Sequence, residues 1–473
     1  MKRIYLLCLL AFILSRSAFS QQWDSVGPHM STYNNIEPDV LYADSSYLYM
    51  AGRFHLINGM HMQGIARWNG VKWDSMGAGI DRLIMYDTGR YNPSHTWAIT
   101  HYHNKLYVGG GFSSVGYLNA PGIGTWNGIA WDTIPVQPFK NESYMGSTGD
   151  VDALTVINNK LYMGGEFDTV AGKPCRGIAC WNDTNWSSLN FGQGFSFELI
   201  DAICEYQGSI YAAGHFAGNN GGIGEIIRLD SAGNWHSVDT GIKGTMDWIN
   251  KMAVYNGELY VGGYFYKSDG NVGNNIQRWN GTSWNDVGGG TDHQIENLLV
   301  YHGKLYAMGV FTEAGGVPVD GIAEWDGTKW CSIDSVTTDN ADPGAAATYK
   351  DSLYVGGDFW TIDGSNISFI AEWVDGNYVA NCGQPTGVNQ LKINNEQLKI
   401  YPNPNNGQFT LSLSNLTENC NVEIYNVLGE KVYTDALPQS QSNINLTGQP
   451  NGVYLIRVNE RNTYLTQKIV KEN

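Results

Sequence analysis

The chain has 473 residues, of which 58 are glycine and 16 are tryptophan, but only 15% are charged. With 42% hydrophobic residues it can bury a large core, which excludes wholesale disorder, and its glycines lack the three-residue period of collagen. The formal net charge of −17 argues against nucleic acid as a partner, because an acidic chain repels phosphate.

Residues 1–20 are typical of a secretory signal peptide. Two basic residues precede an apolar stretch from Ile4 to Leu14, and the small residues Ala18 and Ser20 come before Gln21. No later segment has the apolar length of a membrane span, so we expect no transmembrane segment after signal removal. Six cysteines then remain, with no Cys-x-x-Cys pair, so we predict no zinc site, no metal and no cofactor. We expect a monomer.

One short segment recurs along the chain. Leu48–Phe54 is the first of seven similar segments, each with a Leu-Tyr or Ile-Tyr start and a closing Phe, and the closing residues lie 46 to 58 positions apart. This spacing is typical of a four-stranded propeller blade. The closing residues are Phe54, Phe112, Phe167, Phe216, Phe265, Phe311 and Phe359.

Each segment predicts the second of four short strands, A to D. In one copy these are Met252–Tyr255, Leu259–Phe265, Ile276–Trp279 and Trp284–Val287. Asn-Gly or Asp-Gly pairs such as Asn69-Gly70 separate two tryptophans in most copies and supply the positive φ values of a tight hairpin between strands C and D. The glycine pair in strand B predicts close packing of backbones. Thirteen tryptophans occupy repeat positions and are expected to pack the blades. They are Trp23, Trp68, Trp73, Trp126, Trp131, Trp181, Trp186, Trp235, Trp279, Trp284, Trp325, Trp330 and Trp373.

We therefore predict an all-β chain whose residues 21–382 form a seven-bladed β-propeller, because radial stacking buries the apolar faces of such sheets. Trp23-Asp24-Ser25 copies a D strand, so it can close the ring in place of, or beside, Tyr378 to Cys382. The repeat resembles the kelch and galactose-oxidase type of propeller. That resemblance implies the fold and no oxidase activity, because no Cys and Tyr combination matches the copper site of that family.

After a polar linker, residues 383–396, the segment 397–473 predicts a small immunoglobulin-like β-sandwich. It resembles the type A sorting domain of the type IX secretion system of Bacteroidetes. The resemblance implies general export, passage across the outer membrane to the cell surface or medium, the secretion machinery as partner, and often removal of the domain. The residues that carry it are Tyr401, Pro402, Asn403, Pro404, Gly429, Gly452, Tyr454 and Lys468.

The three tryptophans outside the repeat suggest a ligand site. Trp97, Trp248 and Trp360 fall on the face that carries the D–A and B–C loops, where the longest insertion also brings Arg90 and Tyr91. Long loops on a rigid scaffold often hold binding sites, and exposed indole rings offer stacking surfaces. We predict that these five residues bind the ligand. The alternative is that the tryptophans only plug the loops or the channel mouth.

No local catalytic motif is present, so we predict no catalytic residue. We interpret His101 and His103 as solvated residues near a turn rather than a metal pair. Five loop aspartates could contribute to a calcium site, but we interpret them as ordinary turn residues. These are Asp150, Asp152, Asp339, Asp342 and Asp363.

The leading hypothesis is a secreted or cell-surface binding protein that recognises glycan or protein through the long-loop face. One alternative is a glycan-active lyase or hydrolase with its site at the propeller mouth, and another is a structural component of the surface or matrix. Two acidic side chains with strongly raised pKa values that face each other across the mouth would favour the enzyme.

Overall fold

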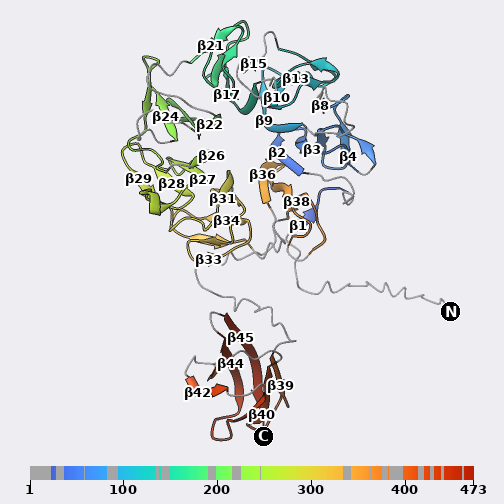
Figure 1. The fold of residues 1–473 in the computed structure, drawn as a ribbon. Coiled ribbons are helices and arrows are strands. Elements are labelled where there is room, and N and C mark those ends of the chain that lie inside the picture. The colour runs from blue at the N-terminus through green and yellow to red at the C-terminus, as the bar shows by residue number, and fades with distance from the viewer. Residues whose placement is uncertain are drawn as a thin grey trace, which may run out of the picture. The chain divides into compact units, whose positions relative to one another are not determined.

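The computed structural model divides into two compact units, residues 1–384 and 385–473 (Figure 1). The predicted signal peptide and linker lie outside the described residues. The described residues are 23–27, 37–57, 59–81, 94–134, 138–139, 149–189, 199–215, 225–244, 247–333, 342–362, 365–374, 382, 398–413, 420–426, 431–437, 441–460 and 463–472.

The first unit is a β-propeller in which seven four-stranded antiparallel sheets stand in a ring (Figure 1). The first blade contains β2 (Glu37–Ala43), β3 (Leu48–Arg53), β6 (Ile65–Trp68) and β7 (Trp73–Ser75). The second contains β9 (His95–Tyr102), β10 (Lys105–Gly111), β13 (Ile123–Trp126) and β14 (Trp131–Asp132). The third contains β16 (Asp150–Ile157), β17 (Lys160–Glu166), β20 (Ile178–Trp181) and β21 (Trp186–Ser188). The fourth and fifth are β22 (Leu199–Tyr206), β23 (Ser209–His215), β24 (Ile226–Leu229) and β25 (Trp235–Ser237); and β26 (Trp248–Tyr255), β27 (Glu258–Tyr264), β28 (Ile276–Trp279) and β29 (Trp284–Asp286). The sixth and seventh are β30 (Ile295–Tyr301), β31 (Lys304–Gly309), β34 (Ile322–Trp325) and β35 (Trp330–Ser332); and β36 (Asp342–Tyr349), β37 (Ser352–Asp358), β38 (Ile370–Trp373) and β1 (Trp23–Ser25).

Because the strands of each blade run up and down, the A–B and C–D turns lie on one face and the D–A and B–C loops on the other. We call these the turn face and the loop face. Short strands extend several loops of the loop face: β4 (Leu56–Ile57), β5 (Met60–His61), β8 (Ile80–Asp81), β11 (Ser114–Val115), β12 (Leu118–Asn119), β15 (Pro138–Phe139), β18 (Thr169–Val170), β19 (Lys173–Pro174), β32 (Glu313–Ala314) and β33 (Val317–Pro318). A 3-10 turn, η2 (Lys267–Asp269), follows β27.

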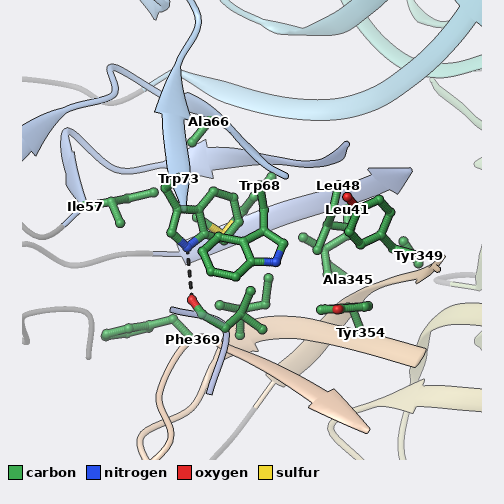
Figure 2. Packing of buried hydrophobic residues seen from close by; sticks show 14 of the residues in the cluster. Leu41, Leu48, Ile57, Ala66, Trp68, Trp73, Ala345, Tyr349, Tyr354 and Phe369 are labelled. Carbon is green, nitrogen blue, oxygen red and sulfur yellow. Dashed lines mark hydrogen bonds between the residues drawn. The ribbon is translucent and has the colours of Figure 1, made fainter. Parts of the chain in front are cut away.

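The ring closes through the first strand of the chain. β1 pairs with β38 in the register Trp23 to Trp373, so it supplies the outer strand of the seventh blade. Figure 2 shows the interface between this blade and the first one, where Tyr354 and Phe369 pack near Trp68 and Trp73. A disulfide between Cys331 and Cys382 links the end of the unit to β35 of the sixth blade. The sequence alone did not indicate which cysteines are bonded.

The repeat tryptophans are structural. All thirteen are buried, as predicted. In five blades the indole N–H of the D-strand tryptophan donates to a backbone carbonyl of the preceding blade, as in the bond of 3.0 Å from Trp73 to Val26 that is drawn dashed in Figure 2. The other four donors are Trp131, Trp235, Trp284 and Trp330. Each of these five tryptophans therefore packs within its own blade and forms a hydrogen bond to the neighbouring blade.

The second unit is a β-sandwich. One sheet contains β39 (Leu398–Tyr401), β40 (Gln408–Leu413) and β43 (Gln441–Asn445), and the other contains β42 (Lys431–Leu437), β41 (Cys420–Tyr425), β44 (Gly452–Glu460) and β45 (Thr463–Lys471). Residues from both sheets form one buried cluster that includes Phe409, Leu411, Ile424 and Ile456. The alternating apolar positions of these strands thus meet between two layers, as the sequence predicts.

Candidate binding site at the mouth of the central channel

A β-bulge interrupts the innermost strand of every blade near its start. In β16, for example, Val151 pairs with Gly165 and Ala153 with Gly164, so Asp152 is the extra residue. A bulge re-aims the side chain that it adds and is common beside functional sites. The seven residues at this position are Asp39, Trp97, Asp152, Asp201, Asn250, Glu296 and Gly344.

The second position of the strand B glycine pair, which is glycine in all seven blades, makes room for this bulge. In each blade a Cβ on the glycine opposite the bulge would lie under 3.0 Å from the backbone carbonyl oxygen at the start of the inner strand. Only glycine fits such a close approach. This confirms the prediction that the pair marks closely packed backbones. The glycines are Gly52, Gly110, Gly165, Gly214, Gly263, Gly309 and Gly357.

All seven bulged residues line one cavity of about 620 Å³. The rest of its wall comes from neighbouring residues at the same ends of the inner strands and from the ends of β3, β17 and β37, including Arg53, Glu166 and Asp358. These strand ends all lie at the loop face. The cavity is therefore the loop-face mouth of the channel around which the seven inner strands stand.

The charge of the cavity is strongly unbalanced. Two basic side chains, Arg53 and Lys251, line it. Arg53 forms an ion pair with Glu37, and Lys251 attracts Asp201. Nine acidic side chains line the same wall: Glu37, Asp39, Asp150, Asp152, Glu166, Asp201, Glu296, Asp342 and Asp358. The mouth thus carries a concentrated negative field.

Two carboxyl groups of this wall have pKa values near neutrality. Burial raises the pKa of Asp201 to about 7, repulsion from Glu296 raises it too, and Lys251 opposes the change. Burial also raises the pKa of Glu296 to about 7, with repulsion from Asp342 acting in the same direction and a hydrogen bond from Gln294 against it. Asp201 and Glu296 belong to the fourth and sixth blades, so the carboxylates interact across the intervening Asn250.

Asp152 of the third blade and Asp342 of the seventh also have raised pKa values, and their blades flank those of Asp201 and Glu296. Burial holds the pKa of Asp152 well above its ordinary value, and repulsion from Asp201 and Asp150 adds to the effect. The pKa of Asp342 is raised by burial and by Asp358. One buried oxygen of each carboxyl, Oδ2 of Asp152 and Oδ1 of Asp342, has no hydrogen-bond partner among the described residues. When these two carboxyl groups ionise, that oxygen has no local compensation.

Asp39 on the first blade is better compensated. Its Oδ2 lies 3.4 Å from Nδ1 of His95 and accepts a hydrogen bond of 3.3 Å from the backbone N–H of Thr96. Burial still raises its pKa, with His95 acting in the opposite direction. The imidazole of His95 stacks on Trp97 at 5.3 Å. The second blade thus contributes Trp97, with His95 stacked against it, to a wall that is otherwise mainly acidic.

The structure separates the residues of the predicted ligand site. Trp97 lines the cavity, because it is the bulged residue of β9. Trp248 is the first residue of β26 and lies two positions before the bulged residue of that strand, Asn250. It pairs with Tyr264, and the two rings stack with their centroids 5.0 Å apart. Trp360 follows β37 and is 50% exposed beside Phe369. Neither Trp248 nor Trp360 is among the cavity's lining residues. Arg90 and Tyr91 lie outside the described residues.

The aspartates that we interpreted as loop residues need a correction. Asp150 and Asp152 lie in β16 and Asp342 begins β36, and all three line the cavity. The bulge disrupts the alternation of these strands, so their starts resemble loops. Asp339 and Asp363 lie outside the described residues. His103 is exposed on the turn after β9, where its ring nitrogens face Asp183 and Asn159, while His101 faces Asp44.

Most of the predicted sorting residues lie at one edge of the sandwich. Tyr401 ends β39 and Pro402, Asn403 and Pro404 follow it; all four are exposed, and both X-Pro bonds among them are cis. The Asn403 side chain donates to the Lys468 carbonyl at 3.0 Å and accepts from Val470 N–H at 2.9 Å. Tyr454 is buried and donates to the Pro450 carbonyl at 2.6 Å, whereas Gly452 begins β44 on the surface. Gly429 lies outside the described residues.

Residues 399–472 match the family model described as a secretion system C-terminal sorting domain. The protein therefore carries a type IX sorting domain, which directs it to the cell surface or the medium. Among the described residues, no helix has the length and apolar character needed to cross a membrane.

Solved structures with a similar arrangement share little sequence with this chain. PorZ, a surface component of the type IX secretion system of Porphyromonas gingivalis, is 13% identical with a TM-score of 0.38, and the match covers 92% of this chain and 66% of PorZ. The extracellular domain of the putative hybrid two-component system BT4673 of B. thetaiotaomicron is 12% identical with a TM-score of 0.45, covering 92% and 56%. This chain thus spans less than two thirds of either structure, and the likeness concerns the fold alone. A search of curated proteins gave no match.

Proposed function

We propose that this protein is a binding protein of the cell surface or medium, and that its ligand, a glycan or a protein segment, binds in the cavity at the loop-face mouth of the channel. One observation supports this proposal above all: the bulged residue of every blade lines the same cavity of about 620 Å³. That volume lies within the range of about 300–1,000 Å³ that is typical of ligand sites.

The chemistry of the wall also supports binding. A bulge in all seven inner strands gives up a regular hydrogen-bond ladder, and the residues that it re-aims include uncompensated acids such as Asp152. Such costs are usual at functional sites, where ligand contacts offset them. Trp97 adds an aromatic surface to the same wall, so polar and apolar contacts are both available to a ligand.

A substitution that fills the cavity tests this proposal. Gly344 is the bulged residue of the seventh blade, and a Cβ there would meet its nearest neighbour, Asp342, at 3.5 Å. Gly344→Trp should therefore be accommodated and should place an indole in the mouth. The purified protein and this variant are compared on a glycan array and a peptide library. We expect the ligands bound by the unchanged protein to be lost, with at least about tenfold weaker binding.

Ile129→Trp is the matched control, because Ile129 is 87% exposed on the turn between β13 and β14 of the opposite face. This variant should retain all binding. Equal binding by Gly344→Trp and the unchanged protein would contradict the proposed site. If the unchanged protein bound nothing in either screen, the structural role at the surface or in the matrix would be favoured instead.

A glycan-active enzyme is the second candidate, and it is favoured by the two interacting carboxyl groups of Asp201 and Glu296 with pKa values of about 7. Glycosidases use one protonated and one ionised carboxyl group. Release of reducing sugar from a panel of polysaccharides would support this candidate if Glu296→Gln removed the activity and Gly344→Trp removed it too. Binding without any turnover would exclude it for the ligands tested.

A further inference from the structure

We propose that the cavity at the channel mouth binds an organic cation, a protonated amine carried on an aliphatic stem. This inference rests on the proposed function and adds the chemical class of the ligand. The first support is the charge of the wall, where nine acidic side chains face two basic ones. Of the two, Arg53 is paired with Glu37 and also attracts Asp358, and Lys251 attracts Asp201, so most of the acids have no basic partner in this wall.

The second support is the state of two individual atoms. Asp152 is a half-buried residue that lines the cavity, and its Oδ2, the buried atom of the carboxyl, has no hydrogen-bond partner among the described residues. Oδ1 of Asp342, four blades further round the ring, is also buried and has no hydrogen-bond partner among the described residues. A buried carboxylate oxygen without a partner is costly, so a donor with positive charge is the ligand group that it favours most.

The spacing of the carboxylates argues for an organic cation rather than a bare metal ion. Among the described residues, the set of three potential metal ligands whose donor atoms lie within 4.8 Å of one another is Glu324, Cys331 and Cys382, which is not in the cavity. The acids of the mouth are therefore too far apart for three of them to close on one ion. An ammonium group has three donors and can reach separate acceptors through hydrogen bonds.

The apolar part of the wall suits the stem of such a ligand. Val40, Leu199 and Trp97 line the cavity together with the acids. Methylene groups gain from contact with such side chains, and an indole also attracts a nearby cation. A lysine side chain or a small diamine combines these features, and a cavity of about 620 Å³ has room for either.

Calorimetric titration of the purified full chain tests the inference. Cadaverine and Nα-acetyl-lysine amide represent a free diamine and a lysine side chain, and pentanediol has the stem of cadaverine without its charge. Titration near pH 8 keeps the amines protonated and lies above the pKa of about 7 of both Asp201 and Glu296. We expect one or both amines to bind and pentanediol not to bind. Calcium chloride should not displace the bound amine.

Asp152→Asn and Asp342→Asn should each weaken amine binding by about 10- to 100-fold, which is the usual worth of a charged hydrogen bond. Asp239→Asn, at an exposed position away from the cavity, should leave it unchanged. Thermal melting of the same samples checks that the variants fold, and loss of negative charge from this wall should not lower their melting temperature.

The inference is overturned if neither amine binds, if pentanediol binds as well as cadaverine, if calcium displaces the amine, or if Asp239→Asn weakens binding as much as Asp152→Asn. Its failure would differ from failure of the proposed function. A neutral ligand whose binding is lost in Gly344→Trp would preserve the site and reject only the cationic class.

Discussion

The two ends of the inner strands differ in how completely their polar groups are satisfied. At the turn face, the last tyrosine of the strand donates to a backbone carbonyl of the next blade, as in the bond of 2.8 Å from Tyr301 to Asp351. Tyr102, Tyr206 and Tyr349 make equivalent bonds. At the loop face, the inner strands β16 and β36 place Asp152 and Asp342 at the channel mouth with unpartnered oxygens. The turn face therefore supports the ring, whereas the loop face holds groups that cost stability.

The largest expected effect on stability distinguishes a tryptophan packed inside the ring from one exposed on the loop face. Trp23 is fully buried in the strand that closes the ring, whereas Trp360 is 50% exposed. Trp23→Ala should lower the free energy of unfolding by about 3–5 kcal/mol, because it leaves a cavity in a packed interface. Trp360→Ala should lower it by less than about 1 kcal/mol. Urea unfolding of the two variants checks this difference, and similar losses would contradict it.

An intermediate effect on stability is expected from Asp201 of the loop face, whose substitution should raise the free energy of unfolding instead of lowering it. Because burial and Glu296 raise the pKa of Asp201 to about 7, the unfolded chain ionises this carboxyl at a lower pH than the folded one. Stability should therefore fall as the pH rises from about 4 to about 7, by up to about 4 kcal/mol. Asp201→Asn removes the ionisation. It should stabilise the protein near pH 8 and have little effect near pH 4.

Chemical unfolding at the two pH values measures this effect. Asp239→Asn is the control, because it removes an aspartate that is exposed. It should change stability little at either pH. If Asp201→Asn destabilised the protein near pH 8, the carboxylate would be a stabilising part of the wall, and the contrast between the two strand ends would be wrong.

Periodicity made much of the ring predictable. The sequence predicts strand C at Ile276–Trp279, and β28 has these bounds. It predicts strand A at Met252–Tyr255, whereas β26 begins at Trp248, because pairing resumes beyond the bulge at Asn250. A bulge breaks the two-residue alternation by which strands are recognised, so the sequence predicts too late a start for β26 and places Asp150, Asp152 and Asp342 in loops.

The cavity itself was harder to predict, because seven residues from seven blades meet only when the ring closes. A signal was nevertheless present. Alignment of the repeats on the second glycine of strand B places Asp39, Asp152, Asp201 and Glu296 at one equivalent position. Of the tryptophans outside the repeat, Trp97 occupies this bulged position, whereas Trp248 lies two residues before it in its own blade. Residue type alone could not separate them, whereas the bulge does.

The smallest expected effect tests the turn face. Tyr301→Phe removes one hydrogen bond to the Asp351 carbonyl and keeps the ring that packs on Tyr306 at 5.9 Å. The loss should be about 1 kcal/mol, since water can reach the freed carbonyl of the exposed Asp351. Tyr117→Phe, at a side chain that is 92% exposed, should cost nothing measurable. Equal stability of both variants in urea would mean that packing alone holds the turn face, and the two strand ends would then differ in charge but not in hydrogen bonding.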